Sequence, residues 1–227
     1  MKGIVIFSGF LLLGATCFAG NWTDLDRAGS VYLSPKFGFS FPVGALADED
    51  YTKPAASWRK EGVTLTLEAG YYLSNTSVFG LEVSYSTFGP KHLSELSCEW
   101  EQDQSRVRIR RVGVFYQYQL VSDGRYRPFL KLGAGLFDAS RISMPQPAHD
   151  PVIYNDYSLG GKPVFSLGLG FVGYISTTLS ASLSVEAVSL NSFASSWETN
   201  GFTYGPLNKN MLFFPAYFSL VYHLPGN

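Results

Sequence analysis

The sequence has little charge and almost no cysteine. Charged side chains make up only 15% of the 227 residues, and the formal net charge is -1. This balance gives no electrostatic basis for binding nucleic acid, so no such partner is expected. The cysteines are Cys17 and Cys98. Cys17 lies in a segment that we expect to be removed, so no internal disulfide is predicted, and Cys98 is expected to be a free thiol rather than an intermolecular disulfide.

The chain lacks an apolar run long enough to cross a bilayer as a helix, which takes about 20 residues. Its N-terminal apolar stretch, residues 4–13, is shorter, follows Lys2 and precedes small residues. This pattern predicts a cleaved secretory signal peptide over 1–19, with cleavage after Ala19 or, nearly as well, after Gly20. Lipid attachment at Cys17 is less favoured, because Gly14 stands where an aliphatic residue is needed. Residues 20–227 then form a single domain.

Histidine is also scarce. His92, His149 and His223 are scattered along the chain without the spacing of metal ligands, so neither a metal site nor a cofactor is expected.

Aromatic residues are abundant, at 16%, while the mean hydropathy is close to zero, +0.06. A wall whose residues alternate between lipid and a polar interior has this average. Eight segments alternate apolar with small or polar residues at period two, each at least as long as the roughly 9–11 residues of a tilted membrane-crossing strand. These segments are 30–41, 62–73, 78–89, 106–121, 127–138, 163–175, 179–190 and 211–224.

The connections between these segments alternate between short and long. Residues 74–77, 122–125 and 176–178 are rich in turn-forming residues, whereas 42–61, 90–105, 139–162 and 191–210 are long, polar loops. This asymmetry is typical of outer-membrane barrels, which have short periplasmic turns and longer extracellular loops. We therefore expect both termini on the periplasmic side.

Residue size indicates which row of each strand faces inward. The polar rows hold small Ser, Thr and Gly with occasional charges, which suits a narrow interior better than a solvated surface. The interior row then contains Lys36, Glu68, Glu82, Arg111, Lys131 and Glu186. Because buried charges must be paired, we predict an ion-pair network that seals the barrel. The alternative is a narrow path for ions or small solutes through the same network.

Aromatic residues near the strand ends predict two girdles at the two membrane interfaces. At the short-turn end these are Tyr71, Phe79, Tyr116, Tyr118, Tyr174 and Tyr222, and at the loop end Phe39, Phe41, Tyr85, Phe137, Phe165 and Phe214.

Residues 126–136, YRPFLKLGAGL, are similar to the RPY-x-x-x-G-x-G strand of the small outer-membrane barrels that include the OmpA transmembrane domain and OmpX. The resemblance implies an all-β, eight-stranded antiparallel up-and-down transmembrane β-barrel in the Gram-negative outer membrane. Its implied partners are outer-membrane lipid, lipopolysaccharide and the barrel-assembly machinery. Family members usually end on an aromatic residue that this machinery recognises, whereas this sequence continues past Tyr222 to Asn227. An internal aromatic residue is therefore expected to serve as the assembly signal.

Arg106, Arg108 and Arg110 share the parity of the lipid-facing residues near the loop end. Guanidinium groups suit bidentate contact with phosphate, so these residues are candidates for contact with lipopolysaccharide phosphates. Ion pairing with the acidic run 99–103 across the same hairpin is the favoured interpretation, and phosphate contact is the alternative hypothesis. The opposite parity of Val107 and Ile109 suggests a register break at Arg110–Arg111.

Residues 92–95, HLSE, loosely resemble the His-x-Ser-Asn motif of outer-membrane lipid A deacylases, but the Asn is missing and the motif falls early in the chain. We therefore expect a non-enzymatic surface barrel that contributes to envelope integrity and presents loops for adhesion or binding of host or surface ligands. The alternative is a narrow diffusion pore, and a lipid A-modifying enzyme is less favoured.

Overall fold

The computed structural model describes residues 27–43, 59–90, 107–139, 142–145, 154–158, 161–190, 196–199, 202–204 and 211–224. The predicted signal peptide lies outside these ranges. The long strands are β1 (Val31–Val43), β2 (Arg59–Tyr72), β3 (Ser77–Pro90), β4 (Val107–Gln119), β5 (Tyr126–Ala139), β8 (Lys162–Tyr174), β9 (Leu179–Leu190) and β12 (Met211–Leu224). Four short strands are β6 (Ile142–Pro145), β7 (Tyr154–Ser158), β10 (Ser196–Thr199) and β11 (Phe202–Tyr204).

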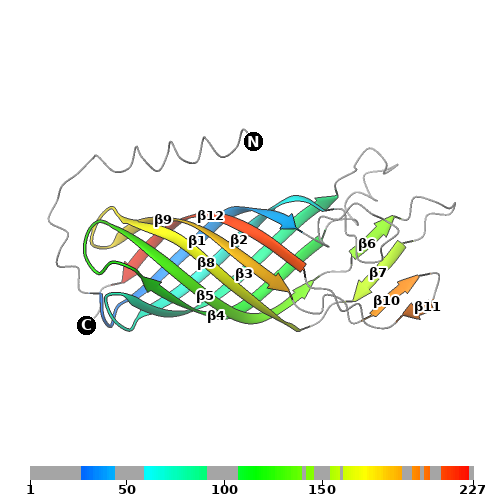
Figure 1. Cartoon of the computed structure of the whole chain (residues 1–227), viewed down its shortest axis with the longest axis horizontal. Helices are drawn as coiled ribbons and strands as arrows, with labels where there is room; N and C mark the ends of the chain where they lie inside the picture. The colour runs from blue at the N-terminus through cyan, green and yellow to red at the C-terminus, as the bar shows by residue number, and fades with distance from the viewer. Residues whose placement is uncertain are drawn as a thin grey trace.

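The eight long strands form a closed barrel in the order β1-β12-β9-β8-β5-β4-β3-β2 (Figure 1). Every neighbouring pair is antiparallel and, except for the closing β1–β12 pair, consecutive among the long strands. The predicted eight-stranded up-and-down β-barrel is therefore confirmed. Each predicted segment ends within three residues of its strand. Within the described ranges, no helix has the length and hydropathy needed to cross a membrane.

The outside of the barrel is apolar, and its inside combines small polar and charged side chains with aromatic and aliphatic ones. Side chains of β1 and β8 alternate between exposed and buried along most of each strand. Leu167 and Leu169 on the outside are 57% and 59% exposed, whereas the intervening Gly168 and the neighbouring Ser166 are buried. This arrangement is the reverse of a soluble barrel, and it gives the strands a lipid-compatible outer surface.

Two of the predicted girdle residues are not on the outer surface. Tyr174 is 0% exposed and Phe137 is 1% exposed, because both have the parity of the inward-facing rows of β8 and β5. Their assignment to the girdles is therefore wrong. The remaining girdle aromatics face outward or are half-buried: Tyr71, Phe79, Tyr116, Tyr118 and Tyr222 at the short-turn end, and Phe39, Phe41, Tyr85, Phe165 and Phe214 at the loop end.

Interior glycines make room for large aromatic side chains of other strands. A Cβ atom added to Gly70 would lie 2.3 Å from the ring of Tyr32, and one added to Gly80 would lie 2.5 Å from the ring of Phe115. Such distances are far below van der Waals contact. The small residues of the polar rows therefore allow a narrow barrel to bury aromatic rings in its interior.

Two of the predicted loops carry additional secondary structure. The short strands form a separate sheet in the order β11-β10-β7-β6, which lies beyond one end of the barrel (Figure 1). Strands β6 and β7 come from the loop after β5, and β10 and β11 from the loop after β9. The pairing of β7 with β10 joins these two loops. Segments of three to five residues carry too little alternation to be identified from sequence.

The pairing of β4 is continuous on both sides. Arg110 is the Cα partner of Tyr85 in β3 and of Asp138 in β5, and Arg111 is the partner of Ser84 and Phe137. The predicted register break at Arg110–Arg111 is therefore wrong. The alternation simply continues to Ile109, which is 1% exposed and faces inward.

Candidate functional site inside the barrel

The six charged residues predicted for the interior lie together in the middle of the barrel. All are at most 5% exposed. Five neighbouring long strands and β9 each contribute one of them: Lys36 from β1, Glu68 from β2, Glu82 from β3, Arg111 from β4, Lys131 from β5 and Glu186 from β9. We call this set the interior network. With three cations and three carboxylates, its formal charge is zero.

Lys131 is the centre of the interior network. Its Nζ atom lies 2.5 Å from Glu68 Oε1, 2.6 Å from Glu82 Oε2 and 2.8 Å from Glu186 Oε1. The same Nζ atom lies 4.7 Å from the ring centroid of Phe115, a cation–π contact. One ammonium group thus donates to carboxylates from three different strands, which links these strands through the interior.

The other two cations complete the network. Lys36 Nζ lies 2.6 Å from Glu68 Oε1. Arg111 Nη2 lies 3.1 Å from Glu82 Oε1 and 3.4 Å from Glu186 Oε2. Each carboxylate therefore contacts two cations, which compensates for the cost of burying it.

The strand register explains why these residues meet. Glu68 and Glu82 are Cα partners on adjacent strands, an arrangement that is unfavourable unless a cation lies between the carboxylates. Lys131 and Glu186 are both Cα partners of Gly168 in β8. A Cβ atom on Gly168 would lie 2.9 Å from Glu186 Cγ. The glycine thus leaves the space across which Lys131 reaches Glu186.

The carboxylates of Glu68, Glu82 and Glu186 are also close enough to share a metal ion, with oxygen atoms within 4.8 Å of one another. The Lys131 ammonium already contacts all three. The Lys131 ammonium group therefore occupies the place that a metal ion would take, and the arrangement is suited to holding the strands together.

A second buried layer lies at the short-turn end of the barrel and was not predicted. His223 is 0% exposed and its ring lies within 5.5–6.1 Å of the rings of Tyr32, Tyr72 and Tyr174. Its Nε2 atom is 2.8 Å from Ser180 Oγ. Parity places His223 in the inward row of β12, so the sequence contained the signal. A small cavity separates this aromatic layer from Lys36 and Glu68 of the interior network.

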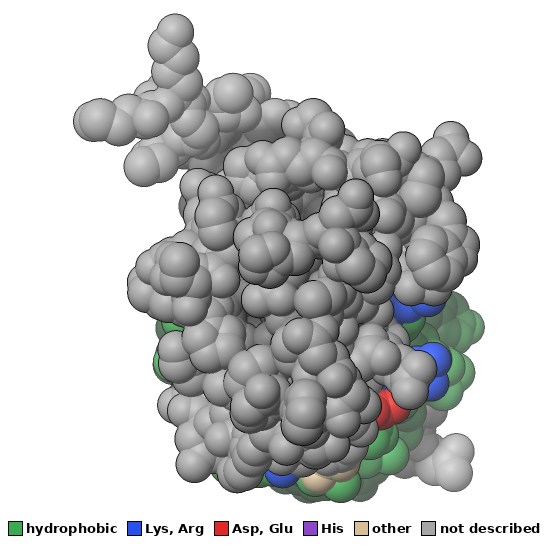
Figure 2. Space-filling model, turned by 90° about the vertical axis from the view of Figure 1, so that its right-hand side faces the viewer, with side chains coloured by type: hydrophobic (Ala, Val, Ile, Leu, Met, Phe, Trp, Pro, Cys, Tyr) green, Lys and Arg blue, Asp and Glu red, His purple; other side chains and the backbone are tan. Residues whose placement is uncertain are grey.

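The arginines proposed to contact lipid phosphate lie apart from the interior network. Arg110 is exposed on the outside of β4 and Arg108 is half-buried there, while Arg106 lies outside the described residues. Figure 2 faces the loop end and shows cationic side chains beside hydrophobic ones at the edge of the barrel. His92, Ser94, Cys98 and the acidic run 99–103 also lie outside the described residues.

Neither a scan against protein-family models nor a search of curated protein sequences finds a match. The structure is similar to neisserial surface protein A (NspA), with a TM-score of 0.52 and 9% identity over 85% of this chain and 96% of that chain. It also matches the N-terminal β-barrel domain of Pseudomonas aeruginosa OprF, with a TM-score of 0.44 and 16% identity over 87% of this chain and 98% of that one. Ail of Yersinia pestis matches with a TM-score of 0.44 and 11% identity, over 87% and 99%.

At 9% identity, the similarity to NspA shows the fold alone. It agrees with the closed antiparallel barrel described above. The resemblance predicted from the strand pattern is thereby confirmed at the level of fold: the chain has the fold of the small, eight-stranded transmembrane β-barrels of bacterial outer membranes.

Proposed function

We propose that the protein is a non-enzymatic outer-membrane barrel with a sealed interior, which contributes to envelope integrity and acts through its loops. The observation that carries this proposal is the interior network. Its six charges are buried and neutralise one another in the middle of a barrel whose width leaves room only for side chains. A conducting pore would instead need solvated charges along an open path.

In this proposal the short turns and both termini face the periplasm, and the long loops face outward. Outer-membrane barrels have this asymmetry. The barrel would be inserted by the barrel-assembly machinery, with an internal aromatic such as Tyr222 in β12 as the recognition signal. Protease treatment of intact cells tests the orientation: cleavage within 142–158 and protection of 122–125 are expected, and the reverse pattern would contradict it.

The loops are proposed to bind a surface or host ligand. The β7–β10 pairing supports this role, because it joins two loops into one sheet that stands beyond the barrel. Rigidly held loop residues form more specific surfaces than separate loops do. Replacing 142–158 by a short Gly-Ser linker should abolish adhesion of expressing cells while the barrel still shows heat-modifiable migration on SDS gels. Retained adhesion would contradict this assignment.

Arg108 and Arg110 are proposed to contact lipopolysaccharide phosphates from the outside of β4. Their support is the parity that they share with the lipid-facing Val112. The double variant Arg108→Gln/Arg110→Gln should reduce the lipopolysaccharide that co-purifies with the barrel. Lys162→Gln serves as the control for loss of a cation elsewhere near the loop end. Unchanged co-purification in the double variant would exclude the phosphate contact.

Planar-bilayer recording tests the sealed interior directly. We expect no reproducible channel events from the purified barrel, and stable unitary conductance would replace the proposal with the diffusion-pore alternative. Mass spectrometry of lipid A from expressing cells tests the non-enzymatic assignment. An unchanged acyl pattern is expected, whereas a gained or lost acyl chain would indicate a lipid A-modifying enzyme.

A further inference from the structure

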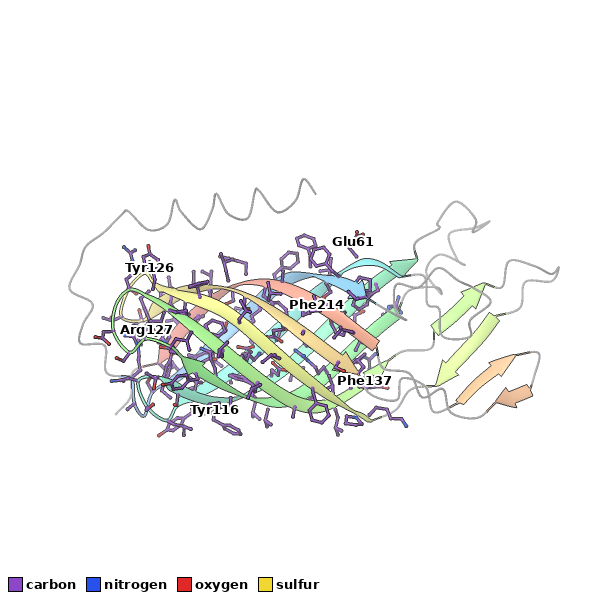
Figure 3. All side chains as sticks on the ribbon, viewed as in Figure 1. Glu61, Tyr116, Tyr126, Arg127, Phe137 and Phe214 are labelled. Atoms are coloured by element: carbon purple, nitrogen blue, oxygen red, sulfur yellow. The ribbon has the colours of Figure 1, made fainter. Side chains whose placement is uncertain are left out.

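Two arginines that are far apart in the sequence are both buried at the short-turn end of the barrel. Arg27 precedes β1 and is 5% exposed, and Arg127 near the start of β5 is 0% exposed. Both guanidinium groups pack on Tyr174, with Cζ atoms 5.1 Å and 4.8 Å from its ring centroid. In Figure 3, Arg127 lies at the end of the barrel opposite the short-stranded sheet, next to the outward-pointing Tyr126.

The guanidinium group of Arg127 is only partly satisfied by hydrogen bonds. Its Nε donates to the carbonyl oxygen of Gly124 at 3.2 Å. Its Nη1 lies 3.5 Å from the carbonyl oxygen of Asn75 and 3.4 Å from Gln119 Oε1. Its Nη2 is buried and has no partner. The acceptors that surround it are all neutral.

The guanidinium of Arg27 is less satisfied. Its backbone is well anchored, since the Arg27 amide donates to Asn75 Oδ1 at 2.7 Å and its carbonyl accepts from Ser30 Oγ at 2.7 Å. The side-chain atoms Nε and Nη2 are both buried without a hydrogen-bond partner. These two atoms form the edge of a guanidinium group that binds a carboxylate or phosphate through two parallel hydrogen bonds.

The charge of these two guanidinium groups is the second feature of this end of the barrel. The interior network is neutral within itself. Among the residues that the structure describes, no carboxylate forms an ion pair with Arg27 or Arg127. Burying an unpaired charge costs several kcal/mol. A bound water molecule would accept a hydrogen bond from one of these donors but would not neutralise the two positive charges.

We propose that the short-turn end of the barrel binds a small oxyanion of the phosphate class, through the Nε–Nη2 edge of Arg27 and with Arg127 Nη2 as a further donor. Tyr174 holds both guanidinium groups in place by packing against them. The bound anion would join the segment before β1 to β5 and would thereby brace the mouth of the barrel.

The experiment uses the mature barrel refolded in a neutral detergent without phosphate. Inorganic phosphate is titrated at constant ionic strength, and binding is followed by isothermal calorimetry and by the unfolding temperature. We expect saturable binding with an increase in the unfolding temperature. Arg27→Gln and Arg127→Gln should each weaken the phosphate affinity by about tenfold or more, since each loses charge-assisted hydrogen bonds.

Arg125→Gln is the matched control. Arg125 lies at the same end and carries the same charge, but its Nε already donates to the Tyr174 carbonyl oxygen at 2.9 Å. Its phosphate affinity should stay within about twofold of the wild type, a difference below 0.5 kcal/mol. Heat-modifiable migration verifies that every variant is folded. Equal affinity in wild type, Arg27→Gln and Arg127→Gln would overturn the proposal.

Separate titrations distinguish the possible sources of the oxyanion. Acetate tests a carboxylate, and short-chain phosphatidylglycerol in the detergent micelle tests a lipid phosphodiester against free phosphate. Asp24 and Asp26 precede Arg27 in the sequence, so Asp24→Asn/Asp26→Asn is also measured. If wild type fails to bind any of these anions, or if binding appears only in the aspartate variant, the arginines serve the chain's own carboxylates and the proposal is wrong.

Discussion

At the scale of single residues, Lys131 has the largest consequence. It contacts all the carboxylates of the interior network, and these carboxylates lie close enough to repel one another strongly. Parity alone was enough to place each of the six side chains inside. Parity could not show that Lys131 rather than Arg111 is the centre of the interior network. That depends on the space left by Gly168 in β8, the strand between Lys131 of β5 and Glu186 of β9.

Lys131→Met keeps the length of the side chain and removes its charge. We expect the free energy of unfolding, measured by urea titration in a lipid bilayer, to fall by about 3–5 kcal/mol, because each of the three buried carboxylates loses one of the two cations that it contacts. Adding Glu186→Gln should restore part of the loss by removing one of the repelling charges. Leu132→Met, an outward-facing neighbour that is 57% exposed, is the control. A stability for Lys131→Met equal to that of this control would show that the network contributes little.

At the scale of elements, the long strands and the short strands differ in how far sequence predicts them. Residues 179–190 and 211–224 were predicted with the bounds that β9 and β12 have. A dozen alternating residues give a periodic signal that tertiary contacts do not override. Strands β6, β7, β10 and β11 have three to five residues each. Such segments become strands only when a partner supplies their hydrogen bonds, and β7 pairs on one side with β6 of its own loop and on the other with β10 of another loop.

The β7–β10 pairing can be tested by crosslinking. Ser158 and Ser196 are Cα partners, and Cα atoms of paired residues are about 4.5–5.5 Å apart, within the range of a disulfide. In a Cys98→Ser background, Ser158→Cys/Ser196→Cys should form a disulfide on mild oxidation, seen as a mobility change on non-reducing gels. Ser143→Cys/Ser196→Cys is the control, since β6 is separated from β10 by β7. Equal crosslinking of the two pairs would contradict the strand order.

At the scale of the whole molecule, the barrel has an apolar outside, a neutral network in its middle and, at the short-turn end, two buried arginines with no carboxylate partner among the described residues. The outer surface requires lipid, because large hydrophobic side chains such as Leu81 and Leu169 are about 60% exposed. The interior requires the opposite: every charge needs a counterion. The barrel is therefore stable only when lipid surrounds its outer surface and its interior charges are paired, the reverse of the arrangement in a soluble protein.

Arginine substitutions on the outer surface measure this requirement. Leu167 lies in the middle of β8 and is 57% exposed. Leu167→Arg should lower the free energy of unfolding in a bilayer by about 2–4 kcal/mol, whereas Tyr126→Arg at the start of β5 should cost only about 0–1 kcal/mol near the interface. Urea titration in liposomes of one lipid composition gives both values. Equal costs at the two positions would contradict the placement of the membrane on the barrel.

The sequence by itself determined the number of long strands, their approximate bounds and which row of each strand faces inward. These properties depend on alternation along a single strand, which is local information. Tertiary structure decided which side chains meet inside, how Tyr174 packs against Arg27 and Arg127, and that two loops form one sheet. Those contacts join residues from different strands across the barrel, and they depend on register, closure and the gaps left by glycines. The eight strands are thus predictable from pattern, while the interior network's connections are a product of barrel closure.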